Sequence, residues 1–291
     1  MPCFGLSAKQ RQASIHKGDF DLAFSVTTWN INSVRLRLPQ VLQFLESASP
    51  DVLCLQETKC PNDAFPSAAF RKAGYEHIAI HGQKGYHGVA IVSRLPLSDD
   101  RRQTYCDIDH TRNISAIVAA PGSRRIRIHN FYVPAGGDEP DREINPKFAH
   151  KLDFIEEMRC LNADAEQADG VSSILVGDLN IAPLETDVWS HKQLLKVVSH
   201  TPIETENLTS MQQDGAWVDL IRAHIPPEEK IFTWWSYRAK DWEAADRGRR
   251  LDHVWSSADL LPLLSRVDVL REARGWERPS DHVPVTAHFN F

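Results

Sequence analysis

The sequence predicts an α/β protein whose two halves resemble each other. Residues 24–29 form an apolar run, residues 35–46 place apolar side chains at helical spacing, and residues 51–55 form a second apolar run. A strand, a helix and a strand in this order are typical of a β-α-β unit. Each half of the chain begins with β-rich segments and carries a pair of helices. We therefore expect an α/β fold in which two similar halves pack together.

The individual elements follow from side-chain spacing and from turn residues. The first helix carries Leu38, Val41, Leu42 and Leu45 on one face, and Pro50 ends it. A turn at residues 81–85 separates two apolar runs, which predicts a hairpin. A polar, irregular stretch extends to about residue 209. The other expected elements are strands at 113–119, 125–133, 174–176, 251–255 and after residue 284, an amphipathic helix at 147–160 and a short helix at 217–224.

The domain organisation follows from length and composition. A chain of 291 residues can bury a large core, and no linker separates its halves, so residues 23–291 are expected to form one domain. Residues 1–22 are basic and mixed and lack the apolar core of a secretory signal. They are expected to be a loosely ordered extension, although their Arg and Ser residues leave an organelle transit peptide open.

Charge and cysteine content limit the classes of function. The net charge is −6, so a polyanion could bind only where positive charge is concentrated locally. The apolar runs are too short to span a bilayer. The five cysteines are odd in number and contain no CxxC pair, which argues against a disulfide framework and fits a reducing cytosol. A cytoplasmic protein without a membrane partner is therefore expected.

Polar side chains gather where the predicted strands end. In V-S-S-I-L-V-G-D-L-N-I-A-P (171–183), Asp178 and Asn180 follow an apolar strand and point the same way. Taken alone, this pair could hold a water molecule or form an Asx turn. The other polar groups at strand ends are Asn30, Asn32, Glu57, Tyr132, Asp252, Asp281 and His282. Several acids at one edge need counter-charge, and oxygen donors favour a hard cation such as Mg²⁺ or Mn²⁺.

Seven motifs carry a resemblance to a known family. They are T-W-N-I-N-S-V-R (28–35), L-Q-E-T-K (55–59), H-G-Q-K-G-Y-H-G-V-A (81–90), Y-V-P-A-G (132–136), G-D-L-N-I-A-P (177–183), R-R-L-D-H (249–253) and S-D-H-V-P-V (280–285). Their order resembles that of bacterial exonuclease III, whose family includes the major human abasic-site endonuclease. The resemblance covers residues 24–291. It implies a DNase-I-like α/β fold, a four-layer sandwich of two mixed β-sheets packed face to face with helices outside.

The resemblance also implies a role for each polar group. Glu57 resembles the main metal ligand, with Asn32 and Asp281 nearby, and Asp178 resembles the group that activates the attacking water. Asn180 and Asn30 would hold Asp178 and the phosphate. Asp252 and His282 resemble an Asp–His pair at the scissile phosphate, and Tyr132 resembles the phenol beside the leaving oxygen.

Contacts to DNA are implied for a second set of residues. Trp234, with Phe232 or Trp255 as companions, resembles the pocket for a flipped-out abasic deoxyribose, whereas Trp235 is expected in the core. Two positions depart from the family pattern: Ser33 replaces Gly, and Ala135 replaces an amide, whose contact the Gly136-Gly137 backbone would supply. The candidates for contacts to the DNA backbone are Arg35, Lys59, Tyr86, Arg112, Arg238 and Arg250.

The predicted function is a Mg²⁺-dependent DNA-repair nuclease acting as a monomer on double-stranded DNA, without an obligate protein partner. It would cut the phosphodiester 5′ to abasic sites and would also act as a 3′→5′ exonuclease and 3′-phosphatase. Two alternatives are a phosphodiesterase for inositol phosphates or sphingomyelin, and a non-catalytic nucleic-acid-binding relative. The T-K after Glu57 argues against the first, and the complete catalytic set argues against the second.

Overall fold

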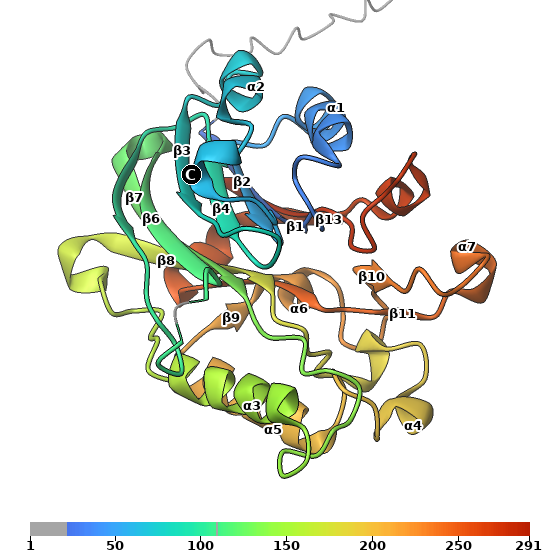
Figure 1. The fold of residues 1–291 in the computed structure, drawn as a ribbon. Coiled ribbons are helices and arrows are strands. Elements are labelled where there is room, and N and C mark those ends of the chain that lie inside the picture. The colour runs from blue at the N-terminus through green and yellow to red at the C-terminus, as the bar shows by residue number, and fades with distance from the viewer. Residues whose placement is uncertain (1–21, 109) are drawn as a thin grey trace, which may run out of the picture.

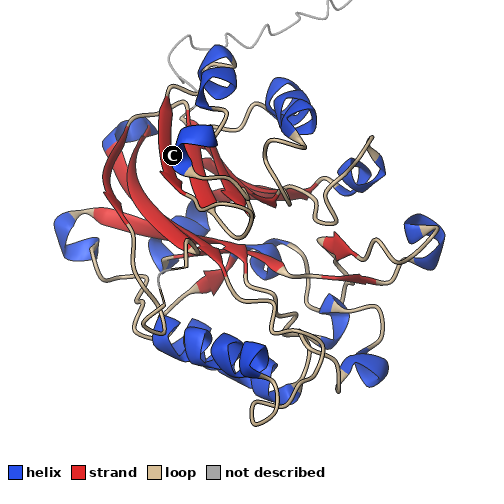
Figure 2. Cartoon of the chain, viewed as in Figure 1, coloured by secondary structure: helices blue, strands red, loops and turns tan. Residues whose placement is uncertain are grey.

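Two six-stranded β-sheets pack face to face, with helices on the outside of each (Figures 1 and 2). The structure, a computed structural model, describes residues 22–108 and 110–291. Residues 1–21 of the predicted N-terminal extension therefore lie outside the described residues. The predicted four-layer α/β sandwich is confirmed.

The first sheet has the strand order β13-β14-β1-β2-β4-β3. β1 runs parallel to β2 and antiparallel to β14, and the predicted hairpin is confirmed as the antiparallel pair β3–β4. The strand β1 is buried except at its first residue, as expected for a strand covered on both faces. Its strands are β1 (Ala23–Asn30), β2 (Val52–Gln56), β3 (His77–His81), β4 (Val89–Ser93), β13 (Leu264–Val269) and β14 (Val285–Asn290).

The second sheet has the order β5-β6-β7-β8-β12-β9. β7 and β8 are parallel, and β12 is antiparallel to β8. A short arm made of β10 (Trp234–Trp235) and β11 (Gly248–Arg249) extends beyond the sheets. The strands of this sheet are β5 (Leu97–Arg101), β6 (Asn113–Ala120), β7 (Arg124–Tyr132), β8 (Val171–Asp178), β9 (Val218–Asp219) and β12 (Asp252–Ser256).

Helices cover the outer face of each sheet. Val41 and Phe44 of α1 and Phe70 of α2 pack on the first sheet, whereas Ile155 of α3 and Leu208 of α5 pack on the second. None of the helices in the described part of the chain is long and apolar enough to cross a membrane. The helices are α1 (Leu38–Ala48), α2 (Ser67–Lys72), α3 (Pro146–Met158), α4 (His191–Leu194), α5 (Pro202–Asp214), α6 (Leu220–His224) and α7 (Trp242–Ala245).

A buried polar bridge joins the two sheets inside the apolar core between them. Gln56 Nε2 at the end of β2 donates to Asn130 Oδ1 of β7 at 2.7 Å, and Asn130 Nδ2 donates to the carbonyl oxygens of Leu55 and Ala90 at 3.1 and 2.9 Å. Both side chains have 0% exposure, so their hydrogen bonds strongly favour one relative position of the sheets. The bridge therefore sets how the strand ends of the two sheets face each other.

The helix α5 corrects a prediction, because residues 202–209 were expected to be irregular. The helix has a weak apolar stripe but a strong start: Thr201 and Glu204 form a capping box, and Pro202 is its first residue. Among its apolar residues, Leu208 and Met211 are buried. The signal for this helix was therefore in its cap rather than in its periodicity. The strands β5 and β13 were also missed.

A buried ion pair ties α3 and α5 to the loop after β8. Lys151 Nζ contacts Glu204 Oε1, and both side chains have 0% exposure. Lys151 Nζ also donates to the carbonyl oxygen of Asn180 at 2.8 Å. Glu204 accepts from the backbone nitrogens of Ser199 and Thr201. One ion pair therefore holds two segments that border the same edge of the sandwich.

We predict that Lys151→Met lowers the free energy of unfolding by about 3–5 kcal/mol, because it leaves a buried carboxylate without its counter-charge. Urea denaturation followed by circular dichroism measures the loss. The control is Arg142→Met, which removes a 3.1 Å ion pair with Asp153 whose side chains are 50% and 52% exposed. The control should cost less than about 1 kcal/mol. Equal losses in the two variants would contradict the role assigned to Lys151.

Candidate active site

The ends of several strands meet at one edge of the sandwich. Asp178 is the register partner of Asp252 on β12 and of Tyr132 on β7, and Asn30 ends β1 beside Gln56. These ends border a cleft of about 630 Å³. Among its lining residues are Glu57, Tyr132, Asp178, Asn180, Trp234, Leu251, Asp281 and His282. The fold therefore brings the polar groups predicted at strand ends to one place.

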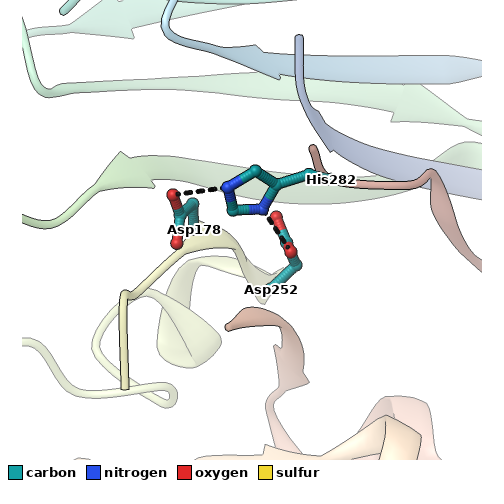
Figure 3. Close-up of side chains that lie close together, drawn as sticks. All are labelled: Asp178, Asp252 and His282. Atoms are coloured by element: carbon teal, nitrogen blue, oxygen red, sulfur yellow. Dashed lines mark hydrogen bonds and ion pairs between the residues drawn. The ribbon is translucent and has the colours of Figure 1, made fainter. Parts of the chain in front are cut away.

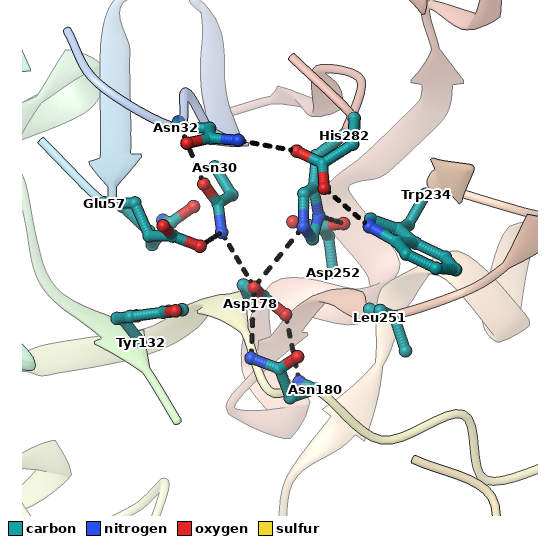
Figure 4. A network of polar contacts seen from close by, with 12 residues as sticks. Asn30, Asn32, Glu57, Tyr132, Asp178, Asn180, Trp234, Leu251, Asp252 and His282 are labelled. Atoms are coloured by element: carbon teal, nitrogen blue, oxygen red, sulfur yellow. Dashed lines mark hydrogen bonds and ion pairs between the residues drawn. The ribbon is translucent and has the colours of Figure 1, made fainter. Parts of the chain in front are cut away.

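Asp178 is held by amides on two sides. Asn30 Nδ2 donates to Asp178 Oδ2 at 2.8 Å, and Asn180 donates to the same carboxylate from its backbone nitrogen and from Nδ2 at 3.0 and 3.2 Å (Figure 4). Gly177 lets β8 approach β7 closely, because a Cβ atom there would lie 1.9 Å from the carbonyl oxygen of Phe131. Asp178 is 1% exposed, and burial raises its pKa to about 7.

His282 lies between two aspartates. Its Nδ1 is 2.8 Å from Asp252 Oδ2, and its Nε2 is 3.6 Å from Asp178 Oδ2 (Figure 3). Burial opposes protonation, but the charges of Asp252 and Asp178 outweigh it and raise the pKa of His282 to about 10. Thr233 Oγ1 donates to Asp252 Oδ2 at 2.6 Å and so fixes the carboxylate from the other side. The arrangement maintains an imidazolium in the cleft.

Two clusters of the described residues contain side chains of the types that bind metal ions. The ligand atoms of Asp178, Asp252 and His282 lie within 4.8 Å of one another. The imidazolium of His282 already balances those carboxylates, and a protonated imidazole offers no lone pair to a metal. The second cluster consists of Glu57, Asn32 and Asp281, which supply only oxygen donors apart from the Asn32 amide nitrogen.

This second cluster fits a hard cation. Lys59 Nζ lies between Glu57 Oε2 at 2.7 Å and Asn32 Oδ1 at 2.6 Å, so a cationic group already occupies this position. Asn32 Nδ2 donates to Asp281 Oδ1 at 3.1 Å. Burial would raise the pKa of Glu57, but the Lys59 ammonium and the Asn30 amide outweigh burial and lower it. An ionised carboxylate beside amide oxygen suits Mg²⁺ or Mn²⁺ better than a softer ion.

The backbone at this cluster adopts an uncommon conformation. Asn32, Glu57 and Lys59 have φ values of 46°, 50° and 51°, in the left-handed region. Hydrogen bonds hold them there: Ser33 N donates to the carbonyl oxygen of Glu57 at 2.7 Å. Such residues cost about 1–3 kcal/mol each and gather at functional sites.

Tyr132 lies on the opposite side of Asp178 from Trp234 (Figure 4). Burial and the charges of Glu57 and Asp178 raise its pKa well above the ordinary value, so the hydroxyl keeps its proton. The Arg112 guanidinium stacks 4.9 Å from the centroid of the Tyr132 ring, and Arg112 Nη1 donates to the Tyr132 carbonyl oxygen at 3.2 Å. Arg112 therefore positions the phenol.

The aromatic wall of the cleft differs partly from the prediction. Trp234 lines the cleft and donates from Nε1 to Asp281 Oδ2 at 3.0 Å. Trp235 is buried, as predicted for a core residue, and it also borders the cleft. Leu251 is an apolar companion of Trp234 at the cleft, whereas neither Trp255 nor Phe232 is among the lining residues (Figure 4). Trp255 is buried beneath α3 and α5 with Nε1 unpaired, and Phe232 packs against Trp235. Their predicted place in the pocket is wrong.

The predicted DNA-contacting residues separate into two groups. Arg250 is a correction: it is 0% exposed, and its Nε and Nη1 lie 2.7 Å from carboxylate oxygens of Asp187 and Asp219. Arg112 is 6% exposed, and its guanidinium stacks on the Tyr132 ring instead of facing solvent. Arg35, Tyr86 and Arg238 are exposed, and Lys59 is partly exposed, so these four remain predictions.

Sequence reasoning missed Thr233, Leu251 and Lys151. Thr233 directly precedes the predicted Trp234 in the sequence, and Leu251 directly precedes Asp252, so both lay inside stretches already singled out. Lys151 carries no local signal, because its partners Asn180 and Glu204 are 29 and 53 residues away in the chain. Of the two departures from the family pattern, Ala135 lines the cleft and Ser33 adopts φ 89°.

A buried carboxylate, an Asp–His pair and an oxygen-rich cluster that fits a hard cation, at the edge of a two-sheet sandwich, are typical of a hydrolase of phosphate esters. The profile of the Endonuclease/Exonuclease/phosphatase family matches residues 27–282, and the chain belongs to this family. It is a phosphodiester hydrolase of the type represented by exonuclease III and its abasic-site endonuclease relatives.

Three relatives illustrate the similarity. Exodeoxyribonuclease III of Haemophilus influenzae is 29% identical over 90% of this chain and 98% of its own length. A 3′ phosphatase from Neisseria, solved with a product DNA hairpin, is 33% identical with a TM-score of 0.82 and covers 92% of this chain and 100% of the other. An abasic-site (AP) endonuclease from Archaeoglobus fulgidus is 30% identical with the same TM-score and the same coverage of both chains.

We predict that Arg250→Met acts on stability and not on phosphate contacts. The variant removes one of the two guanidinium partners of buried Asp187 and the ion pair of partly buried Asp219, so the free energy of unfolding should fall by about 3 kcal/mol. The salt dependence of DNA binding should be unchanged. Arg35→Gln is the contrasting variant: it should keep the stability of the parent and reduce the slope of log Kd against log salt concentration by about one. A reduced slope in Arg250→Met would contradict the correction.

Proposed function

We propose that the chain is a Mg²⁺-dependent DNA-repair nuclease that cuts the phosphodiester 5′ to abasic sites in duplex DNA. It also acts as a 3′→5′ exonuclease and a 3′-phosphatase. The observation that carries the proposal is the complete set of Asp178, Asn180, Asp252 and His282 beside Glu57, in a cleft with one aromatic wall. The three activities share one chemistry, since each breaks the bond from phosphorus to a 3′ oxygen and leaves a 3′ hydroxyl.

Asp178 is the group that activates the water. Its Oδ2 accepts from Asn30 and Asn180, which leaves the carboxylate oriented toward the cleft. A pKa near neutrality lets it accept the proton of a water molecule as that water attacks phosphorus. The water supplies the hydroxyl that joins phosphorus, and the 3′ oxygen leaves and gains a proton. Fixed amides around one carboxylate supply orientation that free water lacks.

His282 and Tyr132 stabilise the negative charge that grows on the phosphate. The imidazolium of His282 is held by Asp252 at 2.8 Å and faces the same cleft as Asp178. Tyr132 stays protonated and can donate to a phosphate oxygen or to the leaving oxygen. Both groups are in place before the reaction, so they require little rearrangement in the transition state.

Glu57, Asn32 and Asp281 are the proposed ligands of the metal ion. When bound, Mg²⁺ neutralises charge on the phosphate oxygens. Lys59, now between Glu57 and Asn32, would move aside or help to hold the phosphate. Mn²⁺ is a chemically similar substitute.

The pocket beside Trp234 and Leu251 is the proposed place of the abasic sugar. An unstacked sugar without a base is the cheapest group to extrude from the duplex. Residues 23–291 are proposed to act as one nuclease domain, as a cytoplasmic monomer on double-stranded DNA. The non-catalytic alternative is favoured by no observation, because none of the proposed catalytic side chains is missing.

We predict that Asp178→Asn and His282→Ala each reduce incision of an abasic duplex by about 10²–10³-fold or more, since each removes a group acting in the transition state. Single-turnover kinetics measure the rate, and thermal unfolding checks the fold. Asp153→Asn, at an exposed position of α3, is the control and should keep the parental rate. Rates above about a tenth of the parental value in both site variants would refute the roles assigned here.

Removal of divalent ions should abolish incision without unfolding the protein. EDTA treatment is expected to stop cleavage of the abasic duplex, and added Mg²⁺ or Mn²⁺ should restore it. Binding of the same duplex in EDTA separates loss of chemistry from loss of affinity. Full cleavage in chelator would exclude the proposed metal requirement, and binding without cleavage at every ion concentration would favour the non-catalytic alternative.

A further inference from the structure

The aromatic wall of the cleft contains a guanidinium without an ionic partner. Arg249 on β11 lines the cleft, and its guanidinium carbon lies 5.2 Å from the centroid of the Trp234 ring. Its Nη1 donates to the carbonyl oxygen of Val198 at 3.0 Å and to Ser199 Oγ at 2.6 Å. Its Nε is buried without a hydrogen-bond partner. No carboxylate among the described residues forms an ion pair with Arg249.

The neighbouring Arg250 is a buried guanidinium whose charge is compensated by carboxylates. Two aspartates lie 2.7 Å from its nitrogens. Among the described residues, Glu204 is the acidic group whose charge acts on Arg249, and its carboxylate is already engaged by Lys151 and the Ser199 backbone. Burial accordingly lowers the pKa of Arg249. A half-buried cation without counter-charge is costly, and an anionic ligand would remove that cost.

The position of Arg249 relates it to the reacting phosphate. Arg249 is the register partner of Trp234 in the β10–β11 arm. The Trp234 backbone forms an isolated β-bridge with His282, and its Nε1 donates to Asp281. Leu251 follows two residues later and lines the same cleft. Trp234 and Leu251 lie together on one side of Asp178, and Tyr132 lies on the other (Figure 4). Arg249 therefore lies on the side of the cleft that is proposed above to hold the abasic sugar, the group attached to the scissile phosphate.

We propose that Arg249 is a specificity-determining residue that binds a compact anionic group, a carboxylate or a phosphate, carried by the substituent that leaves together with the scissile phosphate. The inference rests on the proposed cleavage of 3′ ends. A guanidinium forms paired, charge-assisted hydrogen bonds with such anions, whereas a neutral sugar or hydroxyl offers no counter-charge. The Trp234 ring, 5.2 Å from the guanidinium carbon, helps to hold this cation at the cleft wall.

Three duplexes that differ only at the 3′ end test the inference. Each carries a 3′ phosphate esterified with a two-carbon group ending in a carboxylate (phosphoglycolate), a phosphate (phosphoethyl) or a neutral hydroxyl (hydroxyethyl). The parent protein should remove one or both anionic ends with a kcat/KM about tenfold or more above that of the hydroxyethyl end. Whichever anionic end is faster identifies the anion. In Arg249→Met the ratio should fall to about one, and Arg249→Lys should restore part of it.

Arg247→Met is the matched control. Arg247 is exposed, lines the same cleft and stacks 4.8 Å from the centroid of Trp189, so its loss removes a cation from the same arm without touching Trp234. The ratio of anionic to neutral ends should stay at the parental value in this variant. If the ratio falls as far as in Arg249→Met, the preference comes from the general positive charge near the arm, and the assignment to Arg249 is overturned.

Binding separates this inference from the proposed function. In an Asp178→Asn background with EDTA, the Kd values for the three duplexes should show the same preference, and Arg249→Met should remove it. If the parent cuts neither abasic nor 3′-blocked DNA, the proposed function fails, and binding still decides on Arg249. If the parent cuts and binds all three ends equally, the role of Arg249 is refuted and the nuclease remains. If Arg249→Met does not fold, the role of Arg249 is tested by the ratio of anionic to neutral ends in the parent and in Arg249→Lys.

Discussion

One amide, that of Asn30, joins the two halves of the site. Its Nδ2 donates to Glu57 Oε1 at 2.9 Å and to Asp178 Oδ2 at 2.8 Å, so two carboxylates from different sheets share one donor. The contact exists only while the two sheets hold one relative position, and the buried Gln56–Asn130 bridge specifies that position. The proposed separation between the cation site and the water-activating group is therefore a property of sheet packing.

Burial of charge is the second constraint, and each buried acid has its own compensation. His282 forms ion pairs with Asp178 and Asp252, Lys151 with Glu204, and Arg250 with Asp187. The pairs differ in function: the first faces the cleft, whereas the other two connect loops behind it. Removing one partner from a buried pair is costly, which is why these pairs act as fixed points for the loops. Arg249, beside the cleft and without such a partner, stands apart from this pattern.

The cleft wall and the proposed catalytic groups come from different parts of the fold. The proposed catalytic groups come from strand ends inside the sandwich, where the register ties Asp178 to Asp252 and Tyr132. The wall comes from the β10–β11 arm and from the segment before α5, which are joined by hydrogen bonds from Arg249. Changes in the wall therefore leave the register of the central strands intact. Such a division lets one fold combine the same catalytic groups with different binding walls.

The sequence by itself determined the α/β class, most strands and the polar groups at their ends, because period-two alternation and short polar motifs are local signals. It could not distinguish Arg249 from Arg250 in R-R-L-D, since adjacent residues on a strand face opposite ways and only distant partners decide which way is inward. Asp187 and Asp219 draw Arg250 into the interior and leave Arg249 and Leu251 to line the cleft. The positions of the Trp255 and Lys151 side chains were likewise decided by packing, because their neighbours come from segments far away in the chain.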